Sequence, residues 1–323
     1  MKLQAFVKMI KEELAEYYGE KAKVEHHQVY KNNGVLLQGV CVLLKDRNIA
    51  PTIYLNEYYK EYEEKENKEE IIEKICYIIE QNQLKNSFNV GFFLNYESLK
   101  KYLVYRIINK ERNKELLKKV PYRQIQDLAV VCHCLIENEE IGTGSILIHH
   151  HHLENWKIKE EQLFSDTSAN SPLLEPCKVH KMSQLVKEIL EESVEHKVEE
   201  ICREYPQDKD KLVENTLNYM VEEMEEGQLP MYVLTNSRRY YGAASLVYDE
   251  VMENIAKLFN NDYYILPSSV HELILLEKTE DIQPQELNEM IMEVNRTQVD
   301  EEEWLGDHAY FYCRRTKQLQ CII

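Results

Sequence analysis

Glycine and proline are both scarce in this chain, with nine and eight residues among 323. Turn-rich all-β folds need these residues at many tight turns, so their scarcity argues against a β-sandwich. Long apolar runs are also missing, because none approaches the ~20 residues that a transmembrane helix needs. The first 18 residues mix apolar and charged side chains at helical spacing. We therefore expect neither a signal peptide nor a membrane partner.

No two cysteines of the sequence have the CxxC spacing that is common in metal-binding and redox sites. The eight cysteines are scattered, several lie inside apolar runs, and none forms a CxxC. This usage is typical of buried thiols in a reduced protein and predicts a cytoplasmic location. The sequence also lacks an HExxH motif and glycine-rich phosphate loops of either standard type, so no cofactor is expected.

Positive charge is in short supply, since 57 acidic residues against 39 basic ones give a net charge of −18. Such a chain repels nucleic acid and anionic membranes unless basic residues cluster locally. One cluster exists at 97–123, where nine basic residues stand against three glutamates, a local charge of +6. We interpret it as a solvated basic helix with compensating charge, or as a docking surface for an acidic partner. Nucleic-acid handling through 100–123 is the weakest alternative.

Apolar residues are plentiful enough for a sizeable core, at 44% of the chain. Helical periodicity predicts helices over 1–19 and 69–81. Two β-rich segments, 23–30 and 35–44, are joined by an Asn-Gly turn. The sequence therefore predicts an α-β-β-α unit over 1–95.

Two mixed α/β lobes and an acidic helical hairpin are expected to follow. The first lobe, 96–176, combines the basic helix with a hairpin of strands 127–136 and 145–152 and a helix at 159–169. It ends in a linker at 171–176, where two prolines oppose helix formation. The helical hairpin occupies 177–227, with helices at 182–204 and 208–226 broken at Pro206.

The C-terminal lobe, 228–323, returns to strands. We expect these strands at 231–235, 243–248, 263–266, 270–276, 307–314 and 318–323, with helices at 249–259 and 284–295. The fold class predicted for the whole chain is α+β.

Six short motifs together carry a family resemblance. They are NGV at 33–35, APTIYL at 50–55, YVLTN at 232–236, YYGAA at 240–244, LPSSVHE at 266–272 and VNRTQV at 294–299. Over most of its length the chain resembles DUF5688, a bacterial family of unknown function. Its C-terminal third is also similar, more weakly, to the YtpQ-like family. Neither resemblance implies an activity.

A serine, a histidine and a glutamate lie close together in the LPSSVHE motif. In a strand, Ser269 and His271 share a face while Glu272 points to the other side, so a Ser-His dyad is possible and a triad is not. No nucleophile-elbow pattern surrounds either serine. The alternative is a structural turn in which the hydroxyls bind backbone donors. We expect Glu272 to be exposed or paired with an arginine.

The run IHHHHL at 148–153 raises the question of a metal. In the predicted hairpin, Cys132, Cys134, His149 and His151 could share one face, and thiolate with imidazole suits zinc. Ligands two apart on a strand are ~6–7 Å apart, however, and structural zinc sites usually use CxxC knuckles. We interpret the run as the end of a strand, with a short helix after it, and expect no metal.

A loop at 236–242 contains two guanidinium groups beside tyrosines. Arg238, Arg239 and Tyr241 could grip a phosphate or carboxylate, or the arginines could pair with the Glu-rich hairpin. With His271 and Glu272, they form the predicted binding residues. The acidic run at 300–303 is interpreted as a solvated helix start.

The favoured function is a non-catalytic binding or interaction module with a protein or small-molecule partner. The alternative is a hydrolase-like enzyme that uses Ser269 and His271.

Overall fold

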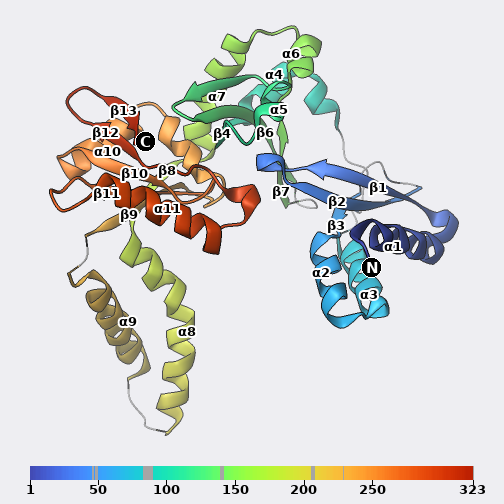
Figure 1. Cartoon of the computed structure of the whole chain (residues 1–323), viewed down its shortest axis with the longest axis horizontal. Coiled ribbons are helices and arrows are strands. Elements are labelled where there is room, and N and C mark those ends of the chain that lie inside the picture. The colour runs from blue at the N-terminus through green and yellow to red at the C-terminus, as the bar shows by residue number, and fades with distance from the viewer. Residues whose placement is uncertain are drawn as a thin grey trace.

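The computed structural model describes residues 1–45, 47, 50–82, 90–138, 142–204, 208–227 and 229–322. Within these residues, three antiparallel sheets are each accompanied by helices, and a pair of helices stands away from them (Figure 1). The α+β class is confirmed. No helix of the described part is long and apolar enough to cross a membrane.

The N-terminal unit packs three helices around a sheet of order β1-β2-β3. Its elements are α1 (Leu3–Tyr18), β1 (Ala22–Tyr30), β2 (Leu36–Leu44), β3 (Thr52–Tyr54), α2 (Asn56–Lys65) and α3 (Lys68–Gln81). The two predicted helices and the β1–β2 hairpin are confirmed. Apolar residues three and four apart on α1, such as Phe6, Ile10 and Leu14, are buried against the Ile71–Ile75–Ile79 face of α3 in one cluster.

The middle sheet is built around its longest strand, β6. Strand β4 pairs with one edge of β6, while β5 and then β7 pair with the other. The elements are α4 (Tyr96–Leu99), β4 (Leu103–Asn109), α5 (Lys114–Leu117), β5 (Tyr122–Ile125), β6 (Leu128–Asn138), β7 (Gly142–Leu147), α6 (His150–Trp156) and α7 (Glu160–Leu174). The predicted β6–β7 hairpin is confirmed.

The expected basic helix over 97–123 is wrong. The segment contains a strand, β4, whose seven residues are all buried, between the short helices α4 and α5. The sequence LVYRIIN is rich in β-branched and aromatic residues that favour a pleated sheet. The many charged residues before and after these seven positions led to the prediction of a solvated helix instead of a buried strand.

The linker expected at 171–176 is also wrong, because α7 continues through Pro172 to Leu174. A proline in the last turn costs one backbone hydrogen bond without stopping the helix before it. Neighbouring bonds hold this end in place: Ser171 Oγ donates to Thr167 O at 2.7 Å, and Glu175 N donates to Ser171 O at 2.9 Å.

The C-terminal sheet has six antiparallel strands in the order β13-β12-β10-β11-β9-β8. They are β8 (Cys177–Lys181), β9 (Met231–Asn236), β10 (Tyr263–Pro267), β11 (Leu273–Glu277), β12 (Tyr310–Cys313) and β13 (Gln318–Cys321), accompanied by α10 (Val251–Phe259) and α11 (Pro284–Gln298). The strand predicted at 243–248 is wrong, since Gly242–Val247 forms a 3-10 helix. Gly242 sits so close to Thr235, Asn236 and His271 that a β-carbon would collide with them.

The acidic helical hairpin is confirmed as α8 (Met182–Glu204) and α9 (Lys209–Glu225). Pro206, the predicted break, lies outside the described residues. Because β8 and β9 pair with each other, the hairpin is inserted between neighbouring strands of one sheet and extends away from it (Figure 1).

The middle and C-terminal lobes share one hydrophobic core, while the N-terminal unit and the hairpin have separate clusters. The four-part division of the chain stays a prediction. The N-terminal unit is joined to the rest through Asn33, whose side-chain amide donates to the backbone oxygens of Glu301 and Trp304. The backbone N–H of Asn33 donates to Asn113 Oδ1 at 3.0 Å.

Candidate functional site

The LPSSVHE motif forms a turn between β10 and β11. Strand β11 begins at Leu273, so the expectation that Ser269 and His271 lie on a strand is wrong. Ser269 N donates to Glu272 O at 3.2 Å, and His271 N donates to Ser269 Oγ at 3.0 Å. The hydroxyl therefore satisfies a backbone donor inside the turn.

The imidazole of His271 is held from both sides. Its Nδ1 accepts a hydrogen bond from Tyr241 N at 2.9 Å, and its Nε2 lies 3.1 Å from Glu303 Oε1. Since Nδ1 is the acceptor, the proton of the neutral ring is on Nε2 and faces the carboxylate. Ser269 Oγ is bonded to the backbone instead, and this geometry does not form the hydrogen bond that a Ser-His dyad uses.

Glu303 was missed by sequence reasoning, which assigned the acidic run at 300–303 to solvent. Its backbone oxygen also accepts from Val270 N at 2.9 Å, so both its main chain and its side chain meet the turn. The run itself gave no signal, because this contact joins residues more than 30 positions apart.

The loop at 236–242 braces the base of the hairpin. Arg239 Nη2 lies 2.5 Å from Glu188 Oε2 on α8, so the predicted pairing of an arginine with the Glu-rich hairpin is confirmed for Arg239. Glu272, which was expected to be exposed or paired with an arginine, is half-buried. Tyr240 stacks on the His271 ring with centroids 5.0 Å apart. The loop thus connects the LPSSVHE turn with the hairpin.

Beneath Tyr241 lies an ion pair that is almost completely buried. Both side chains of Arg106 and Glu175 are 1% exposed, with Nη1 to Oε2 at 2.5 Å and Nη2 to Oε1 at 2.8 Å. The guanidinium also lies 5.1 Å from the centre of the Tyr241 ring. A bidentate pair of this kind fixes β4 against the end of α7. Arg106 is therefore a structural part of the core and no part of a basic surface.

The four metal candidates do not come together. Cys132 and Cys134 point into the core from β6, and Cys132 Sγ accepts from Thr167 Oγ1 at 3.5 Å. His149 and His151 lie beyond the end of β7, with their ring centres 5.4 Å apart. Among the described residues, no three histidine, cysteine or acidic side chains are grouped as a metal ion requires.

The histidine run itself begins a helix, so the strand expected through it is wrong. Strand β7 ends at Leu147 and α6 starts at His150. His149 N donates to His152 Nδ1 at 3.0 Å, which satisfies a backbone donor at the helix start. Burial lowers the pKa of His152 to about 4, assisted by the neighbouring His151 and His149. The pKa of His133 is also well below its usual range, because of burial and of Arg106 nearby.

The remaining basic residues of 97–123 are distributed over several short elements. Lys100, Lys114 and Lys118 each pair with a glutamate three positions away. These pairs match the predicted compensation of charge, although the helix that was expected to carry it is absent.

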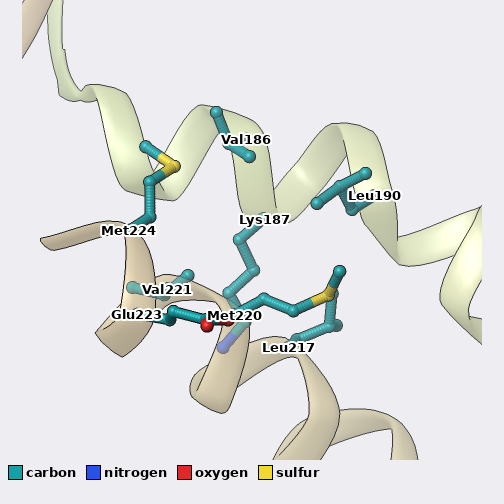
Figure 2. A pocket seen from close by; sticks show the side chains of 8 residues that line it. All are labelled: Val186, Lys187, Leu190, Leu217, Met220, Val221, Glu223 and Met224. Carbon is teal, nitrogen blue, oxygen red and sulfur yellow. The ribbon is translucent and has the colours of Figure 1, made fainter.

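A groove runs between α8 and α9 near the base of the hairpin. Its volume is about 260 Å³, and it is lined by Val186, Lys187, Leu190, Leu217, Met220, Val221, Glu223 and Met224 (Figure 2). Six of these residues are apolar. Lys187 reaches across from α8, where Nζ donates to Asn218 Oδ1 at 2.8 Å. Sequence reasoning predicted the two helices and missed the groove.

The signal for this groove was present in the spacing on α9. Leu217, Met220, Val221 and Met224 follow the i, i+3, i+4, i+7 pattern of one helix face. Leu217 is buried, whereas Met220 is 40% exposed. Nearby, Ile189 and Tyr219 are 71% and 64% exposed. The hairpin therefore presents more apolar surface than its own two helices cover.

Polar bonds fix the hairpin to the sheet below the groove. Lys181 Nζ lies 3.1 Å from Glu225 Oε1, and Ser183 Oγ donates to the same oxygen. Together with Arg239–Glu188, these contacts hold both helices at their base. These contacts hold the hairpin, and with it the groove, in a defined orientation to the C-terminal sheet.

These features define the class: an α+β protein of three antiparallel sheets with an inserted acidic helical hairpin. Within it, the chain belongs to DUF5688, a family of unknown function whose model matches residues 3–314. The family expected from the motifs is thereby confirmed, while the resemblance to the YtpQ-like family stays a prediction. No curated protein and no solved structure matches the chain.

Proposed function

We propose that this protein is a non-catalytic interaction module that binds a helix of a partner protein in the groove between α8 and α9. The observation that supports the proposal is the apolar groove on a hairpin that stands away from the sheets (Figure 1, Figure 2). At about 260 Å³ it is smaller than the pockets that enclose whole small ligands, and suits a few side chains of a larger partner.

The side chains of the groove favour a helical partner. An amphipathic helix places its apolar residues at i, i+3, i+4 and i+7, which matches the row on α9. Met220 and Met224 contribute flexible, polarisable side chains that adapt to such anchors. The occupant is therefore an amphipathic helix with large aliphatic anchors.

Charge determines the rest of the partner's chemistry. Residues 182–226 contain fourteen acidic and five basic side chains, a net charge of −9, which is half of the −18 of the whole chain. Such a field attracts lysine and arginine at the rim of the bound helix and repels acidic helices. The partner is thus a basic amphipathic helix.

A labelled peptide tests the proposal directly. It has about 20 residues, so that the helix can form, with leucines at helical spacing and lysines on the flanks. We expect micromolar binding by fluorescence anisotropy that weakens as salt is raised. A scrambled peptide of the same composition, and one with glutamate in place of lysine, should bind much more weakly.

Two matched variants locate the binding. Met220→Glu places a charge in the groove and should weaken binding about tenfold or more. Met292→Glu makes the same change on α11 at a similarly exposed methionine, 49% against 40%, and should leave binding unchanged. If the two variants bind the peptide with equal affinity, the peptide does not bind in the groove. A dimer that Met220→Glu dissociates would show that a second copy occupies it.

A cytoplasmic location belongs to the same proposal. The eight free cysteines support it, because unpaired thiols are usual in proteins of reducing compartments.

A further inference from the structure

A polar cleft lies where the middle sheet meets the C-terminal sheet, and none of its lining residues belongs to the hairpin. Its volume is about 900 Å³, and its charged or titratable lining includes Lys110, Glu111, Arg112, Asp127, Asp307 and His308. One wall comes from the residues after β4 and the turn between β5 and β6. The other comes from the residues before β12 and the end of β13, where Cys321 lies.

Hydrogen bonds between the two lobes fix the walls. Tyr310 Oη donates to Asp127 Oδ1 at 2.7 Å, and Asn109 Nδ2 donates to Leu305 O at 3.1 Å. Within one wall, Lys110 N donates to Asp127 O at 3.2 Å. Because these bonds join the two walls to each other, the cleft is preformed, and its volume is within the range of small-ligand sites.

Three charged groups in the cleft have no ion-pair partner among the described residues. Lys110 Nζ donates to the neutral amide oxygen of Gln124 at 2.7 Å. Asp127 accepts from the Tyr310 hydroxyl, and Asp307 Oδ1 lies 3.4 Å from the side-chain amide of Asn295. The cleft therefore presents one cation and two carboxylates whose charges are free to meet a ligand.

Arg112, Glu111 and Cys321 are less available to a ligand than these three groups. Arg112 stacks over the Trp304 ring at 4.2 Å and lies 3.6 Å from Glu301, while Glu111 pairs with Lys114. Burial raises the pKa of the Cys321 thiol to about 11, so it stays protonated and is no nucleophile. His308 Nδ1 is buried without a hydrogen bond inside the described part of the chain.

The geometry points to a binding site for a small molecule that carries one carboxylate and two cationic nitrogens, as a basic amino acid does. The carboxylate pairs with Lys110, and the two nitrogens pair with Asp127 and Asp307. This site is separate from the hairpin groove, and binding of one ligand does not depend on the other.

Three related compounds test the charge pattern by isothermal titration calorimetry on the full chain. L-Lysine has all three groups, cadaverine lacks the carboxylate, and 6-aminohexanoate lacks the α-ammonium group. We expect L-lysine to bind at least about tenfold more tightly than either analogue. Equal binding of all three, or no binding of L-lysine at millimolar concentration, would overturn the assignment.

Variants place the ligand in the cleft. Asp127→Asn keeps an acceptor for the Tyr310 hydroxyl and should weaken L-lysine about tenfold or more, as should Lys110→Met. Lys101→Met, an exposed lysine of the same lobe, should bind like the parent. If Lys101→Met weakens L-lysine binding as much as the cleft variants do, or if both cleft variants bind L-lysine like the parent, the ligand does not bind in this cleft. All of these variants should bind the basic amphipathic peptide like the parent, so that the test of the cleft is independent of the test of the groove.

Discussion

At the scale of single residues, Arg106 and Glu175 form an ion pair whose two charges are almost completely buried. A buried charge without its partner is costly, so Glu175→Ala should lower the free energy of unfolding by about 3–5 kcal/mol. Replacing both residues with apolar ones of similar size, Arg106→Met with Glu175→Leu, should recover much of the loss. Urea unfolding measures both, and a Glu175→Ala variant as stable as the parent would contradict the role of the pair.

Ser269 is predicted to act through the turn alone. Its hydroxyl accepts one backbone hydrogen bond, so Ser269→Ala should lose about 1 kcal/mol of stability and keep peptide binding. A serine-hydrolase probe should leave the parent unlabelled. Labelling at Ser269 that disappears in His271→Ala would instead support the hydrolase alternative.

His152 makes the free energy of unfolding depend on pH. Its pKa in the folded chain, about 4, is below the ~6.5 of an unfolded chain, so folding favours the neutral ring. The stabilisation is complete above pH ~6.5 and is lost progressively as the pH falls toward 4. His152→Asn can still accept from His149 N and should show a smaller drop in Tm between pH 7 and pH 5. An exposed control, His27→Asn, should keep the full drop.

At the scale of elements, most of the regular structure could be predicted from periodicity. The helices α1, α3, α8 and α9 show clear helical patterns, and the Asn-Gly turn identified the β1–β2 hairpin. The failures have physical reasons. Helix α2 buries none of its residues completely and contacts the core only through Tyr58, Tyr59 and Tyr62, so its strongly polar sequence shows a weak apolar pattern. Strand β4 contains Arg106, whose complete burial is compensated by Glu175, a residue 69 positions further along the chain.

The candidate sites were less predictable than the elements. Ser269, His271 and Tyr241 were chosen for their residue types, and the structure brings the last two together through a backbone bond. Glu303 and the cleft residues Asp127 and Asp307 come from distant segments that only the tertiary fold assembles. No spacing within one segment could have predicted those contacts.

The hairpin should behave as a separable element. It inserts between the paired strands β8 and β9, and its apolar cluster is separate from the main core. Replacing residues 182–229 with a short glycine-containing turn should therefore leave a folded protein with cooperative unfolding. This variant should bind L-lysine like the parent and lose peptide binding. Unfolding of the remaining chain would show that the hairpin is required for the sheet.

At the scale of the whole molecule, the three sheets form a body from which one acidic element projects (Figure 1). The middle and C-terminal lobes are fused by a common core, and the N-terminal unit is attached through the side chains of Asn33 and Asn113. This organisation places the two proposed sites in different parts of the molecule: the cleft at the lobe junction and the groove on the hairpin.

Hydrogen exchange of the full chain with and without the basic amphipathic peptide tests the central claim most directly. The account predicts slower exchange in α8 and α9 around the groove, with unchanged exchange in the LPSSVHE turn and the cleft. Met220→Glu should abolish that protection, and Met292→Glu should retain it. Protection confined to other elements, or none in α8 and α9 at saturating peptide, would contradict the proposed function.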